Sequence, residues 1–157
     1  MGADFTKIGI LARREIEARI LAPVVKEFSR ELGRERTLAI VEPIIISLAR
    51  EAGEQLAKMV GGNTLDHFMK GLPMWTREDA LQVQLLEQNS KKVCFNVSRC
   101  RYAEMYQELG IRDLGFLFSC NRDGALIQGF NPKIKFTRTQ TIMEGAPFCD
   151  FRYEMKE

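Results

Sequence analysis

Apolar residues recur at helical spacing through the first half of the chain. The first stripe ends at Gly33 and consists of Leu21, Val24, Val25, Phe28 and Leu32. A second stripe covers residues 40–56 and closes at Gly61 and Gly62, and a short third helix is predicted over residues 64–70. Pro23 and Pro43 lie inside the two stripes. Each is expected to kink its helix or to begin a new one, because proline has no N–H for the helical ladder.

The hydrophobic period changes to two after Trp75. Residues 81–85 and 93–97 alternate apolar and polar side chains around a turn at residues 88–90, which predicts an antiparallel hairpin. Two more strands are predicted over residues 134–142 and 148–155. Helices are predicted between the two pairs of strands, over residues 101–109 and 112–128.

These patterns predict an α+β fold in a single domain, residues 1–157. A helical N-terminal half, residues 1–74, would pack on a four-stranded antiparallel sheet with two inserted helices, residues 75–157. Side chains at the ends of such strands can converge on one pocket, so we expect Cys100, Asp123 and Cys149 to approach one another.

Composition and charge narrow the classes of partner. The net charge is +2 with acids and bases interleaved, so no nucleic-acid binding is expected. No apolar run approaches the roughly 20 residues of a membrane span, and the first residues lack the order of a signal peptide. We therefore expect no membrane association and a cytoplasmic location, where the four cysteines are thiols. Met1, Gly2 and Thr6 match a weak myristoylation pattern.

Three of the four cysteines have polar or charged neighbours. Cys100 lies between two arginines, Cys120 precedes an asparagine and Cys149 precedes an aspartate. Nearby positive charge lowers the pKa of a thiol, so these cysteines are candidates for nucleophilic chemistry. No C-x-x-C pair is present, and neither a metal nor a cofactor is predicted. The single histidine, His67, is expected at the surface or an interface.

Two carboxylates share a helical face with a thiol. Glu104 follows Cys100 at i+4, and Asp123 follows Cys120 at i+3. A carboxylate in this position can activate water or accept a proton. The alternatives are a buried thiol beside a solvated Glu104, and an Asp123 that pairs with Arg122 or caps the turn at Gly124.

Strand alternation gives two further candidates. Cys149 shares a face with Phe151 and Tyr153. Arg138 shares a face with Phe136 and Gln140. If that face is inward, Arg138 needs an anion, and a substrate carboxylate would satisfy it. If the face is outward, Arg138 is a surface cation.

The C-terminal run NVSRCRYAEMYQELG…LGFLFSCNRD…FNPKIKFTRTQTIMEG…CDFRY resembles the L-2-amino-thiazoline-4-carboxylic acid hydrolase family. The resemblance covers residues 81–153. It implies an enzyme that opens a thiazoline-like ring acid towards N-carbamoyl-cysteine. The family-like residues are Cys100, Glu104, Cys120, Asp123, Asn131, Arg138, Thr141, Gly145, Cys149 and Asp150.

The resemblance implies roles for these residues. Cys149 attacks the ring carbon, the route that the repeated thiols favour, or Asp123 activates a water instead, with Cys100 as a further catalytic candidate. Glu104 would protonate the departing group if burial raises its pKa. The substrate-binding candidates are Arg138, Arg99, Asn131, Thr141 and Cys120. Cys149 is expected to be the most reactive thiol and Cys94 to be inert.

Two other classes of function stay open. The domain could be a non-catalytic small-ligand or thiol-based sensor domain, with a pocket lined by Tyr102, Phe116, Phe118, Phe130 and Phe151. It could also be a structural partner that forms a homo-oligomer through its N-terminal helices, around Ile44, Ile45 and Ile46.

Overall fold

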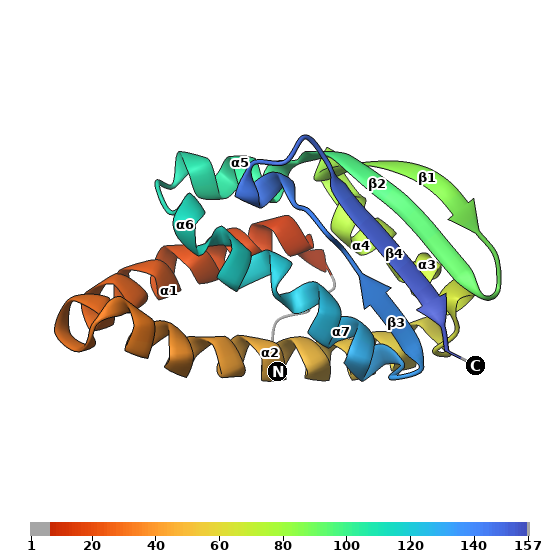
Figure 1. Ribbon diagram of the computed structural model, residues 1–157, viewed down its shortest axis with the longest axis horizontal. Coiled ribbons are helices and arrows are strands. Elements are labelled where there is room, and N and C mark those ends of the chain that lie inside the picture. Colours follow the sequence, from red (N-terminus) through yellow and green to blue (C-terminus); the bar gives the residue numbers. More distant parts are fainter. Residues whose placement is uncertain (1–6, 157) are drawn as a thin grey trace.

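Two long helices form the N-terminal half of the protein (Figure 1). This computed structural model describes residues 7–156, so the myristoylation pattern lies outside the described residues. Helix α1 (Ile10–Leu32) and helix α2 (Arg34–Val60) are joined at Gly33, whose φ of 85° favours glycine. Pro23 and Pro43 lie inside these helices, so the prediction that either proline begins a new helix is wrong.

Three short helices lead from α2 to the sheet. They are α3 (Leu65–Gly71), α4 (Pro73–Thr76) and the 3₁₀ turn η2 (Arg77–Asp79). The Thr64 hydroxyl caps α3 by accepting a hydrogen bond from the His67 amide, and it also lies 2.7 Å from Nδ1 of His67. The single histidine therefore takes part in a helix cap.

The sheet has four antiparallel strands in the order β1-β2-β4-β3. The strands are β1 (Leu81–Gln88), β2 (Lys92–Cys100), β3 (Ile134–Thr137) and β4 (Cys149–Met155). The predicted α+β fold with a four-stranded antiparallel sheet is confirmed. Strand β3 ends earlier than predicted, because the amides of Thr139 and Gln140 both donate to the Asp150 carboxylate, each at 2.9 Å. The chain then forms the 3₁₀ turn η4 (Ile142–Glu144).

The segment between β2 and β3 contains a π-helical turn. Helices α5 (Arg101–Glu108) and α6 (Arg112–Gly115) are followed by the π-helical segment η3 (Phe116–Cys120) and by α7 (Arg122–Phe130). The Asn121 amide donates to the Phe116 carbonyl at 2.8 Å, an i to i−5 bond. The single helix predicted over residues 112–128 is therefore wrong in its middle.

The buried side chains form two clusters that meet near the ends of β1 and β2. One cluster packs the inner face of the sheet, including Cys149, Phe151 and Tyr153, against α3 and α7. This confirms that these three residues share a face. The other cluster joins α1, α5 and η3. Trp75, Leu81 and Cys100 pack against both clusters, so they mark the junction between them.

Helices α2 and α7 approach closely through two glycines. A Cβ at Gly53 would fall on the carbonyl oxygen of Leu126, and a Cβ at Gly129 would fall on the carbonyl oxygen of Arg50. Only residues without a side chain allow the two backbones this close. The contact holds α7 in place beneath the sheet (Figure 1).

We expect Gly129→Ala to destabilise the protein. The added methyl would push α7 away from α2, and overpacking of this kind costs about 1–3 kcal/mol, or roughly 2–12 °C in melting temperature. Gly124→Ala is the matched control in the same helix, because its Cβ would lie 3.5 Å from the Phe136 ring in ordinary contact. Thermal melts followed by circular dichroism measure both variants. Equal melting temperatures would show that the two helices are not held by this contact.

Candidate functional site

A cavity lies at the junction of the two core clusters. It offers about 80 Å³ to the centres of water molecules, enough for several waters or a small ligand. Its wall combines apolar side chains with arginines, thiols and one carboxylate. The lining residues that matter below are Arg14, Trp75, Cys100, Tyr102, Cys120, Arg122, Asp123, Arg138, Cys149 and Phe151.

The fold brings five of the predicted site residues to this cavity. Cys100 ends β2, Cys120 ends η3, Asp123 lies in the first turn of α7, Arg138 follows β3, and Cys149 begins β4. The prediction that Cys100, Asp123 and Cys149 meet around one pocket is confirmed as geometry. Their chemical roles stay predictions.

Arg138 and Asp123 form an ion pair in the cavity wall. Nη1 of Arg138 donates to the Asp123 carboxylate, and Nη2 donates to the Cys120 carbonyl at 3.0 Å. The guanidinium also lies 5.2 to 5.9 Å from the ring centroids of Phe151, Phe136 and Phe116. Arg138 therefore faces inward, and its anion within the protein is Asp123. The ion-pair partner of Asp123 is Arg138 rather than Arg122.

Burial and the ion pair shift the pKa of Asp123 in opposite directions. Burial raises the pKa of the Asp123 carboxyl, and the Arg138 guanidinium only partly offsets this rise. Burial alone would lower the pKa of Arg138, but the Asp123 carboxylate reverses the shift. The Asp123 side chain is 29% exposed, and it lines the cavity. Because its pKa is raised, the Asp123 carboxylate accepts a proton more readily than a solvated aspartate does.

Burial also raises the pKa of each cavity thiol. The pKa of Cys100 rises to about 11, and the pKa values of Cys120 and Cys149 are raised as well. Sγ of Cys149 accepts a hydrogen bond from the Ile142 amide at 3.2 Å, and Arg138 lowers its pKa further, but burial outweighs both. The expectation that these thiols have lowered pKa values is therefore wrong, because desolvation of the thiolate is a larger effect than nearby positive charge.

Arg14 and Arg122 also line the cavity, although the sequence pattern singled out neither as a site residue. Both contact Glu17, at 2.6 Å and 3.4 Å, and Nε of Arg122 donates to the Phe118 carbonyl at 2.6 Å. Burial lowers the pKa of Arg122 to about 10. With Arg138 and Asp123, this group carries three positive and two negative charges. The excess positive charge suits an anionic ligand.

Residues 13–153 match the family described as L-2-amino-thiazoline-4-carboxylic acid hydrolase, which is nearly the whole chain. The protein belongs to this family. No curated protein matches the sequence.

One similar solved structure is the crystal structure of the phenol-responsive sensory domain of the transcription activator PoxR with phenol. It is 15% identical, with a TM-score of 0.54, over 86% of this chain and 72% of the PoxR chain. At this identity the likeness shows a shared fold alone.

Two of the predicted site residues, Arg99 and Glu104, lie at the surface of this member of the hydrolase family. Glu104 binds Arg99 at 2.8 Å, and both side chains are more than two-fifths exposed. They line a separate surface hollow beside α1 rather than the cavity. The hydrogen bond from Arg99 lowers the pKa of Glu104. The condition for Glu104 to act as an acid, a pKa raised by burial, is therefore not met.

Asn131 and Thr141 are buried, and their side chains bond a backbone carbonyl and a residue of η4. The Asn131 amide donates to the Asn63 carbonyl at 2.9 Å, which ties the end of α7 to the loop before α3. The Thr141 hydroxyl bonds the Glu144 carboxylate at 2.7 Å and caps η4. Neither residue lines the cavity. The contacts of both residues therefore stabilise the fold outside the cavity.

Residues 7–156 contain neither of two features that would point to a particular partner. No group of three or more His, Cys, Asp and Glu side chains is arranged to hold a metal ion in this part of the chain. Among the same residues, no helix combines the length and apolar character that crossing a membrane requires.

We expect slow alkylation of Cys100, Cys120 and Cys149 in the folded protein at neutral pH. A rise in pKa from about 9 to about 11 cuts the thiolate fraction of Cys100 at pH 7 about 100-fold. Iodoacetamide labelling mapped by mass spectrometry should therefore be much faster in denaturant, and the native rate should climb as pH rises. Rapid native labelling of Cys149 at pH 7 would instead support the original prediction that it is the most reactive thiol.

Proposed function

We propose that this protein hydrolyses a small thiazoline-like ring acid, giving a product of the N-carbamoyl-cysteine type. Membership of the family supports the reaction class. The observation that carries the proposal is the partly buried Asp123–Arg138 pair in a cavity that has a surplus of arginine. Such a wall offers a base for water and cations for a carboxylate in one enclosed space.

The proposed step is addition of water to the ring carbon that lies between nitrogen and sulfur. Asp123 takes a proton from the water as its oxygen bonds to that carbon. Asp123 passes this proton to the ring nitrogen, whose double bond to the carbon becomes a single bond. The hydroxyl of the intermediate then gives its proton to Asp123 as the carbonyl forms and the carbon–sulfur bond breaks, and Asp123 passes that second proton to the departing sulfur, which leaves as a thiol. Asp123 can return each proton it accepts, so no separate acid is needed and Glu104 has no part in the step.

The water route is favoured over attack by Cys149. A thiol must lose its proton before it attacks, and burial raises the pKa of all three cavity thiols. Arg138, whose charge lowers the pKa of Cys149, is already paired with Asp123. In this proposal the thiols form part of the wall that encloses the ring.

Arg14 and Arg122 are proposed to bind the substrate carboxylate. Both side chains are largely buried, with exposed fractions of 16% and 12%. They share one carboxylate, Glu17, so part of their charge stays uncompensated within the protein. Guanidinium groups hold carboxylates with directed hydrogen bonds.

The first test measures thiol release. Purified protein is incubated with excess L-2-amino-thiazoline-4-carboxylic acid, and free thiol is followed with a colorimetric reagent. We expect Asp123→Asn to reduce kcat at least about 100-fold, since general-base catalysis contributes roughly 10²–10⁴-fold. Asp113→Asn is the matched control, because Asp113 is exposed and pairs with Arg34 at the surface.

Binding must be separated from turnover in this test. Trp75 is the only tryptophan and lines the cavity, so its fluorescence reports occupancy of the cavity directly. Asp123→Asn that binds substrate but does not release thiol supports the proposed base. Full activity in this variant, with loss in Cys149→Ser, would establish the covalent route instead.

We expect Arg14→Gln to raise KM for the ring acid by about tenfold or more, with a smaller change in kcat. A hydrogen bond to a charged group is worth roughly 1.5–3 kcal/mol. Arg19→Gln is the control on the same helix, since Arg19 is 60% exposed and pairs with Glu15. An unchanged KM in Arg14→Gln would remove Arg14 from the carboxylate site.

A second candidate is a small-ligand sensor domain. It is favoured by the fold shared with the phenol-responsive sensory domain and by the aromatic side chains of Trp75, Tyr102 and Phe151 in the cavity wall. Quenching of Trp75 by phenol, without thiol release from the ring acid, would favour this candidate over the hydrolase.

A further inference from the structure

Large apolar side chains are exposed along the two N-terminal helices. Of the exposed side chains of this kind in residues 7–156, all but Leu85 and Leu86 of β1 lie on α1 or α2. We call this set the α1–α2 apolar face. It consists of Ile16, Ile20, Val24, Phe28, Leu32, Ile40, Ile44, Leu48 and Met59.

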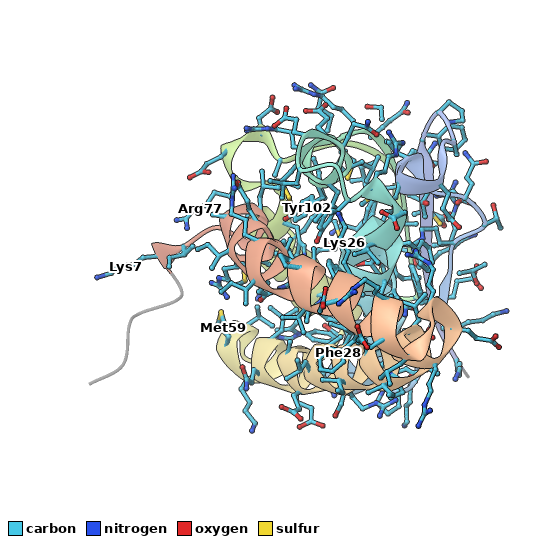
Figure 2. The ribbon with its side chains drawn as sticks, turned by 90° about the vertical axis from the view of Figure 1, so that its left-hand side faces the viewer. Lys7, Lys26, Phe28, Met59, Arg77 and Tyr102 are labelled. Carbon is cyan, nitrogen blue, oxygen red and sulfur yellow. The ribbon has the colours of Figure 1, made fainter. Side chains whose placement is uncertain are left out.

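The apolar face is regular and continuous. Its five members on α1 recur at every fourth residue, so they form one inclined row that winds partly around the helix. Ile20, Val24, Leu48 and Met59 line a common groove between α1 and α2. Figure 2 views the molecule with α1 and α2 in front and labels Phe28 and Met59 on them. These four residues therefore give the face a part that both helices share.

The size of this surface matches half of a stable dimer interface. From their exposed fractions of 40 to 69%, the nine side chains leave on the order of 800 Å² in contact with water. The largest apolar patch on a typical monomer is about 300–600 Å², whereas a standard interface covers about 800 Å² on each partner.

The charges around the face do not suit a membrane surface. Basic and acidic residues are nearly equal in number on α1 and α2. Several are already paired along the helices, including Arg19 with Glu15 and Arg30 with Glu27. Helices that lie on anionic lipid are typically rich in lysine and arginine on their polar face. A protein partner with equally balanced charge fits better.

We infer that the α1–α2 apolar face binds a second copy of this chain. Two helical hairpins that meet through this face around a twofold axis form a four-helix arrangement, in which each row of apolar residues is covered by its counterpart. The chain itself supplies a partner with the matching area and balanced charge.

The inferred dimer also bears on the cavity. The groove shares Arg14, Trp75 and Arg122 with the cavity wall. A partner seated on the groove would therefore cover the side of the cavity that α1 and α2 form. This inference does not depend on which reaction the cavity supports.

The test is the mass of the full chain in solution, by sedimentation or light scattering at micromolar concentration. We expect twice the chain mass of 18.0 kDa. Ile20→Glu and, separately, Ile44→Glu should raise the dissociation constant about 100-fold or more, because each buries a carboxylate in an apolar contact. Both residues are more than half exposed, so circular dichroism and melting of the monomer should change little. Leu86→Glu, at a similarly exposed position on β1, is the matched control and should stay dimeric.

Three outcomes would overturn the inference. They are a monomer at these concentrations, a dimer that neither Ile20→Glu nor Ile44→Glu weakens, and a dimer that Leu86→Glu disrupts as strongly as they do. Sedimentation with vesicles of anionic phospholipid is run in parallel. Monomeric protein that binds the vesicles through Ile20 and Ile44 would assign the face to lipid instead.

Discussion

The ion pair between Asp123 and Arg138 connects the parts of the molecule that the site requires. Asp123 belongs to α7, which the contacts of Gly53 and Gly129 hold against α2. Arg138 leaves the end of β3, and three aromatic rings surround its guanidinium. Removal of one partner would leave a buried charge without its counterion, which is far costlier than loss of a surface pair. Helix, sheet and cavity therefore depend on the same two side chains.

The loss of contact with water that makes the ion pair important also sets the chemistry of the cavity. Burial raises the pKa of Asp123 and of the three thiols, and it lowers the pKa of Arg122. Each shift disfavours charge, yet Arg14, Arg122 and Arg138 still outnumber Asp123 and Glu17. An anionic ligand would relieve this imbalance, and the positive charges would act on it with little screening by water. The proposal of a small acidic substrate rests on this excess of positive charge.

Much of the fold was predictable because hydrophobic period depends on local geometry. The switch from helical spacing to alternation after Trp75, and the antiparallel sheet, follow from which residues face the core. The early end of β3 could not be predicted, since it depends on Asp150 accepting two amides from a distant segment. Resemblance pointed to Cys100, Cys120, Asp123, Arg138 and Cys149, which meet at the cavity. Arg14 was not found, because Arg14 and Glu17 at i and i+3 have the spacing of an ordinary surface pair.

The π-helical turn of η3 sets the rotational phase of α7. Each residue of an α-helix turns the chain by about 100°, so one residue of extra length rotates everything that follows by that amount. Two arginines of the site donate hydrogen bonds to backbone carbonyls of this turn. Arg122 donates to the Phe118 carbonyl, and Arg138 donates to the Cys120 carbonyl. Loss of either Leu117 or Phe118 would leave every cavity side chain chemically intact but swing Asp123 away from Arg138. In this family member the alignment of a carboxylate with its partner is thus encoded by the number of residues in a turn as well as by their kind.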